Sequence, residues 1–155
     1  MSGFATATGA GVPSPVTART VMLGFAAGVL SVLVVLQGAL WLLNVTGLVP
    51  LRPYSLQPIP PFGVPQFANQ AFWGGLWGIV LAAILRRASR LPDLLFGFAF
   101  GAVALNIVVW FVLPAIKGTP YFGGGDPKRL ATAVFLNGSF GWGAALILRW
   151  LRNRA

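Results

Sequence analysis

Cysteine and histidine are both absent from this chain of 155 residues. Their absence excludes disulfides, thiol nucleophiles, thiolate metal sites, imidazole bases and histidine-ligated haem. Acidic residues are almost as scarce, since Asp93 and Asp126 are the only two. They fall in different segments between apolar runs, so they do not supply the carboxylate pair that acid–base catalysis or a two-metal centre needs. We therefore expect no enzyme activity, no catalytic or metal-binding residues and no bound cofactor.

Charge of either sign is also scarce, because only 8% of the residues are charged and 57% are hydrophobic. A soluble domain carries about 25% charged residues, and a small one cannot bury this much apolar surface. The net charge of +9 would fit nucleic-acid binding, but the basic residues sit in short groups between apolar runs. There they contact anionic headgroups. The expected partners are therefore membrane lipids and not nucleic acid.

Four apolar runs are long enough to cross a bilayer as helices. Helices are the expected form because backbone groups in lipid must find hydrogen-bond partners within their own segment. The sequence therefore predicts an all-α integral membrane protein, a four-helix bundle in one domain over residues 20–155, preceded by a flexible leader at 1–19. The runs extend over about 20–43, 65–85, 92–114 and 127–150.

Lysine and arginine between the runs predict the orientation, because they are enriched in cytoplasmic loops. Seven of the 11 fall on the side of the termini and the middle loop. This asymmetry predicts cytoplasmic termini, and the short chain, rich in Gly, Ala and Arg and with brief loops, favours a bacterial inner membrane. The seven are Arg19, Arg86, Arg87, Arg90, Arg149, Arg152 and Arg154, and the other four are Arg52, Lys117, Lys128 and Arg129.

Three short signatures occur twice in the same order, which is typical of an internal repeat. They predict two parallel helical-hairpin repeats, about 20–87 and 92–152, related by an axis along the membrane normal. In this alignment Asn69 and Asn137 take matching places. The paired signatures are Gly-Phe-Ala-Ala-Gly at 24–28 with Gly-Phe-Ala-Phe-Gly at 97–101, Pro-Phe-Gly at 61–63 with Pro-Tyr-Phe-Gly at 120–123, and Phe-Ala-Asn at 67–69 with Phe-Leu-Asn at 135–137.

Small residues spaced four apart occur in three of the runs. This spacing places them on one helix face, where they allow two backbones to approach closely. They either pack helices within the bundle or form an interface with a partner membrane protein. The residues are Gly24, Gly28, Gly74, Gly78, Gly97 and Gly101.

Amides are the polar side chains expected at membrane depth. An amide in lipid needs a partner, and interhelical amide bonds contribute about 0.6–2 kcal/mol. They either join helices or line a polar path, and no charged residue deep in the runs is available to bind an ion or relay a proton. The residues are Gln37, Asn69, Asn106 and Asn137.

Two loops carry further local signals. The segment from Val45 to Val64, with the adjoining Pro65, contains six prolines, which predicts a stiff, extended segment on the outer face. In the second loop, Asp126 precedes Pro127, which predicts a helix with Asp126 as its N-cap and Pro127 at its first position.

Two functions remain open from the sequence. The first is a small non-catalytic membrane protein that acts as an accessory or assembly subunit of a larger complex, or as a homo-oligomer. The alternative is a small channel or facilitator for a neutral or apolar solute, which would use the amides.

Overall fold

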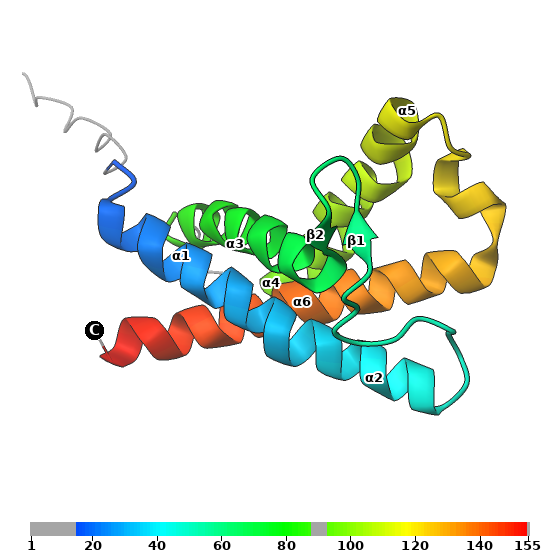
Figure 1. The fold of residues 1–155 in the computed structure, drawn as a ribbon. Coiled ribbons are helices and arrows are strands. Elements are labelled where there is room, and N and C mark those ends of the chain that lie inside the picture. The colour runs from blue at the N-terminus through cyan, green and yellow to red at the C-terminus, as the bar shows by residue number, and fades with distance from the viewer. Residues whose placement is uncertain (1–14, 88–92, 155) are drawn as a thin grey trace, which may run out of the picture.

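The computed structural model describes residues 15–87 and 93–154. Within them lie four helices that are long and apolar enough to cross a membrane (Figure 1), so this prediction is confirmed. Each helix end lies within four residues of the predicted one. Most of the predicted leader, Arg90 and Pro92 lie outside the described residues. Spans 1 to 4 are Ala18–Val45, Gln66–Leu85, Asp93–Lys117 and Pro127–Arg154.

Span 1 is one continuous helix with a wider, π-helical middle. It consists of α1 (Ala18–Leu30), the π-helix η1 (Ser31–Leu36) and α2 (Gln37–Val45). It begins before the predicted start because Thr17 caps it: the Thr17 hydroxyl oxygen accepts a hydrogen bond from the Thr20 N–H at 3.3 Å. Such a cap satisfies one of the backbone donors that a helix start leaves unpaired.

The proline-rich loop leads into span 2, which is the single helix α3 (Gln66–Leu85). The loop was expected to be extended, but it folds back on itself as a hairpin of two short strands. They are β1 (Pro58–Ile59) and β2 (Val64–Pro65), which pair antiparallel. Gly63 makes the turn possible with a φ of 66°, which a residue without a Cβ adopts freely. The 20 residues of α3 extend about 30 Å, the thickness of a hydrocarbon core.

Span 3 changes helical type along its length. It consists of α4 (Asp93–Phe100), the π-helices η2 (Gly101–Leu105) and η3 (Val108–Val112), and α5 (Leu113–Lys117). The span continues past Pro114, where the sequence predicted its end. Pro114 lies just beyond the π-helix η3, and local π-helical adjustment is one way in which a transmembrane helix accommodates proline.

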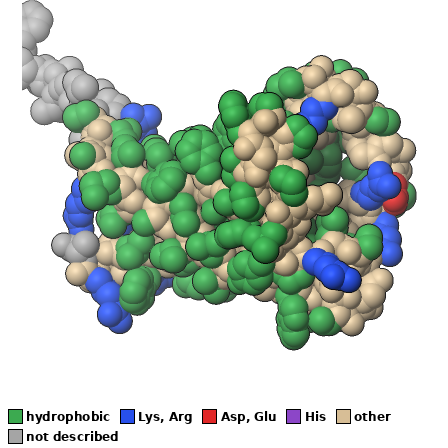
Figure 2. Space-filling view, viewed as in Figure 1, with side chains coloured by type: hydrophobic (Ala, Val, Ile, Leu, Met, Phe, Trp, Pro, Cys, Tyr) green, Lys and Arg blue, Asp and Glu red, His purple; other side chains and the backbone are tan. Residues whose placement is uncertain are grey.

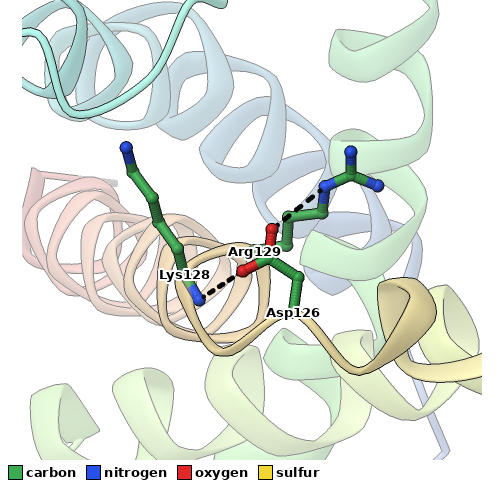
Figure 3. Close-up of polar contacts among 3 residues, drawn as sticks. All are labelled: Asp126, Lys128 and Arg129. Carbon is green, nitrogen blue, oxygen red and sulfur yellow. Dashed lines mark hydrogen bonds and ion pairs between the residues drawn. The ribbon is translucent and has the colours of Figure 1, made fainter.

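Span 4 is α6 (Pro127–Arg154), preceded by the short 3₁₀ segment η4 (Tyr121–Gly125). The Asp126 Oδ1 atom accepts a hydrogen bond from the Lys128 N–H at 2.9 Å. Its other oxygen lies 3.5 Å from the Nε of Arg129 in an exposed ion pair (Figure 3). The predicted N-cap is therefore confirmed.

The helices pack as two pairs joined through α6. Span 1 packs on α3, the first half of span 3 packs on α6, and α6 also packs on α1 and η1. The start of α1 and the end of α6 lie at one end of the molecule, here called the terminal end, whereas α2, α5 and η4 lie at the far end (Figure 1). Apolar side chains cover the middle, and Lys and Arg gather toward both ends (Figure 2). This distribution suits helices that cross a bilayer.

Candidate functional site

Four of the predicted glycines meet where α1 crosses α3. A Cβ on Gly24 would lie 2.8 Å from the carbonyl oxygen of Gly78, and a Cβ on Gly28 would overlap the carbonyl of Gly74. The backbones of the two helices therefore touch directly, which only glycine permits. In this crossing the small-residue faces contact helices of the same chain.

The other two predicted glycines lie where span 3 crosses α6. A Cβ on Gly97 would lie 2.5 Å from the carbonyl oxygen of Gly141 and 2.6 Å from the Ala145 Cβ, and a Cβ on Gly101 would overlap the carbonyl of Asn137. Sequence reasoning did not select Gly141, although Gly141 and Ala145 show the same four-residue spacing of small side chains. This second crossing also lies inside the chain.

The two crossings have the same detailed contacts. In the first, the Phe25 ring covers Gly75, and a Cβ added there would lie 2.6 Å from the Phe25 Cδ2 atom. In the second, the Phe98 ring covers Gly138, and an added Cβ would lie 2.6 Å from the Phe98 Cε2 atom. Each pair of helices therefore combines a backbone contact with a phenyl ring laid over a glycine.

These contacts give Asn137 a different counterpart from the one the sequence alignment gave. Gly28 meets the carbonyl of Gly74, and Gly101 meets the carbonyl of Asn137 in the same way. In these contacts the carbonyl of Asn137 in α6 takes the place that the carbonyl of Gly74 takes in α3. The sequence alignment of Phe-Ala-Asn with Phe-Leu-Asn therefore has a different register from the one that the helix contacts give.

A third close contact joins the two helix pairs. The buried Ser31 Oγ donates a hydrogen bond to the carbonyl oxygen of Phe140 at 2.6 Å. A Cβ on Gly143 would lie 2.6 Å from the same hydroxyl oxygen. Ser31 was not selected from the sequence, although it is a hydroxyl side chain within a long apolar run, which was the available signal. It fixes span 1 against α6.

Gln37 is the centre of a hydrogen-bonded group that holds the proline-rich loop. Its side chain is 1% exposed. The Gln37 Nε2 donates to the Gln70 Oε1 at 2.9 Å, and the Gln37 Oε1 accepts from the Tyr54 N–H at 2.8 Å. The Tyr54 hydroxyl donates to the Leu33 carbonyl oxygen at 2.6 Å. One amide therefore ties spans 1 and 2 together and fastens the loop to them.

Asn106 is the centre of the second amide pair and is completely buried. Its Nδ2 donates to the Ala102 carbonyl oxygen at 2.9 Å, and its Oδ1 accepts from the Asn137 Nδ2 at 2.8 Å. Asn106 lies between η2 and η3. Because π-helical turns interrupt the regular ladder of backbone hydrogen bonds, the side chain there supplies a donor to a backbone carbonyl.

Three of the four predicted amides therefore lie in two separate pairs, Gln37 with Gln70 in one pair of helices and Asn106 with Asn137 in the other. The half-buried Asn69 belongs to neither pair, and its side chain makes no hydrogen bond with residues 15–87 or 93–154. Across those ranges, every buried side-chain nitrogen and oxygen has a partner. The same ranges contain no group of three His, Cys, Asp or Glu residues that could hold a metal ion.

The second half of span 3, residues 107–117, separates from the bundle; we call it the far arm. It packs on η4, where the rings of Phe111 and Phe122 lie 4.8 Å apart, rather than along α6 in the part of the chain that the structure describes. Every residue of η3 is described, and none is buried. The exposed apolar side chains of the far arm are Ile107, Val109, Phe111, Val112, Leu113 and Ile116. Pro114 of the same arm is buried and Trp110 packs on Phe122, so one side of the arm is covered and these residues form its exposed side.

No protein-family model, curated protein or solved structure matches the chain. Its own features are two glycine crossings, two amide pairs and the apolar far arm. The first two features hold the bundle together, whereas the far arm presents an apolar surface that the rest of the bundle does not cover.

Proposed function

We propose that this chain is a small non-catalytic integral membrane protein that serves as an accessory or assembly subunit of a larger membrane complex, or as a homo-oligomer. The far arm carries the proposal. Helices in lipid associate through close packing, because lipid tails are as apolar as the side chains. A segment that leaves its own bundle loses that packing, and a helix of another chain would restore it.

The small residues pack helices within the chain, and this supports the same proposal. The six predicted glycines are in contact with helices of their own chain, so another chain would meet larger side chains. Such side chains are available at the far end, where Trp41, Leu42 and Val45 of α2 are exposed in addition to the far arm. We therefore assign the partner surface to the far end of the molecule.

We also propose that the two helix pairs are parallel repeats in a bacterial inner membrane with cytoplasmic termini. The matching contacts of Phe25 on Gly75 and of Phe98 on Gly138 support the repeat. The excess of arginine at the terminal end supports the orientation. A cysteine-accessibility assay on Arg52→Cys and Arg154→Cys in sealed vesicles would test it, with labelling of position 52 alone from the periplasmic side as the expected result.

The partner surface can be tested with bulky substitutions that leave the bundle interior unchanged. Ile107→Trp and Val112→Trp place large rings on exposed positions of the far arm. Leu95→Trp is the matched control, because Leu95 is exposed on the packed half of the same span. Each tagged variant is extracted gently from native membranes, and the associated protein is quantified by mass spectrometry. We expect about a tenfold loss of associated protein for the far-arm variants, which corresponds to roughly 1.4 kcal/mol of binding free energy, and no loss for Leu95→Trp. Equal association in all three would refute the assignment.

A channel or facilitator for a neutral solute is the second candidate. It is favoured by Asn69, whose half-buried amide makes no hydrogen bond within the described residues and is therefore available to a solute. In a channel, Asn69→Leu should abolish solute flux into proteoliposomes, whereas Gln57→Leu in the exposed loop should not. Unchanged flux in Asn69→Leu would exclude this function.

A further inference from the structure

An apolar hollow of about 520 Å³ lies against α3 near the terminal end. It is a shallow groove that is largely open on one side. It is lined by Val16, Ile79, Val80, Ala83 and Ile84, and it ends at Arg87. The hollow therefore combines an apolar wall with a single cationic end.

The hollow faces the lipid rather than the bundle. Gly74 and Gly78 lie on the face of α3 that contacts α1, whereas the side chains of Val80 and Ile84 are exposed. The wall follows α3 from Ile79 to Ile84, a rise of about 8 Å, and Arg87 lies two residues beyond the end of α3. A molecule that enters sideways from the bilayer can therefore lie along α3.

The two neighbouring arginines have different parts in this site. The Arg86 Nη1 donates to the Pro15 carbonyl oxygen at 3.1 Å and to the Thr20 hydroxyl oxygen at 3.0 Å. These bonds hold the segment before α1 against α3 and so position Val16 as one wall. Arg87 is exposed and lines the end of the hollow.

We propose that this hollow binds one anionic phospholipid, with an acyl chain along α3 and the phosphate at Arg87. A guanidinium group forms paired, charge-assisted hydrogen bonds with phosphate oxygens. An inorganic phosphate ion would leave the apolar wall unused. A zwitterionic lipid would fill the wall but would add a positive group beside Arg87. Charge and shape together therefore select an amphipathic anion.

The test measures lipid retention by the full chain. The protein is reconstituted in phosphatidylcholine with a minor fraction of phosphatidylglycerol and extracted, and bound lipid is counted by native mass spectrometry. Arg87→Gln should lower phosphatidylglycerol retention about fivefold, the factor that corresponds to roughly 1 kcal/mol for one basic residue at an anionic surface. Arg52→Gln, an exposed arginine at the far end, is the matched control and should retain it fully.

Val80→Trp fills the hollow without removing charge and should also lower retention. Wild-type retention in Arg87→Gln would overturn the proposal, and so would equal retention of phosphatidylcholine. Displacement of the lipid by millimolar inorganic phosphate would overturn it too, because it would show a simple anion site. If Val80→Trp fails to fold, the comparison of Arg87→Gln with Arg52→Gln decides alone.

Discussion

Gly78→Ala is expected to destabilise the bundle, because the added methyl group has no room. A Cβ at this position would overlap the Gly24 carbonyl oxygen and lie 2.8 Å from the Gly28 Cα. Both are backbone atoms, which cannot rotate away, so α1 and α3 would have to separate. Overpacking of this kind costs about 1–3 kcal/mol. Loss of the neighbouring glycine contacts would add to that cost.

Gly38 offers a matched control of the opposite sign. It also lies in a helix of span 1, but a Cβ there meets no atom within 4 Å. Replacing an exposed helical glycine with alanine stabilises a helix by about 0.5–1 kcal/mol. The same chemical change should therefore lower the unfolding free energy at Gly78 and raise it at Gly38.

The free energy of unfolding in bilayer discs, measured by steric trapping, separates the two outcomes. Native mass spectrometry of the same samples shows whether association changes. We expect Gly78→Ala to lose stability before any specific loss of a partner. A folded Gly78→Ala variant of wild-type stability that no longer associates would refute the internal crossing and place Gly78 on a partner surface.

Three further predictions concern hydrogen bonds. Asn106→Leu and Asn137→Leu, combined in a double-mutant cycle of unfolding free energies, should show a coupling of about 0.6 kcal/mol and at most about 1.7 kcal/mol; additive effects would mean that the two amides do not interact. Tyr54→Phe removes the donor to the Leu33 carbonyl oxygen, so limited proteolysis should cut the loop at 46–65 faster, and an unchanged cutting rate would show that this bond does not restrain the loop. Asp126→Ala should lower the unfolding free energy by about 1 kcal/mol through loss of the helix cap, whereas Asp126→Asn should retain most of it; equal losses would contradict the capping role.

The spans were predictable from sequence because a bilayer sets the length of an apolar run whatever its neighbours are. The ends were less predictable, since they depend on local chemistry. Thr17 extends span 1 backward by capping it, and span 3 continues through Pro114 where a π-helical segment adjoins it. The π-helical segments were not predictable, because a run that is apolar all round has no periodicity from which to read the helical type.

The glycine pattern predicted close packing but not the partner of each face. Spacing by four residues defines a face of one helix, whereas the identity of the facing helix depends on the whole bundle. The contacts of Gly28 with Gly74, and of Gly101 with Asn137, supply that identity. In these contacts small side chains and backbone carbonyls set the register of the helices, and Asn69 takes no part in them.

The amide partners depended on long-range geometry. Gln37 was recognisable as a polar group in an apolar run, but its bond with the Tyr54 N–H required the proline-rich loop to fold back. Ser31 was overlooked because a single hydroxyl in a long apolar run is a weak signal. Its bond with the Phe140 carbonyl oxygen joins the two pairs of helices, and neither pair alone predicts it.

The most direct test of the proposed function is the mass of the complex that contains the wild-type chain. The tagged full-length protein is extracted from native membranes in mild detergent and measured by native mass spectrometry, with identification of every bound chain. An accessory or assembly subunit should be recovered at a fixed ratio with another membrane protein, or as a defined oligomer of itself. Recovery only as a 16.4 kDa monomer with bound lipid would contradict the account and would favour solute flux through the amide region.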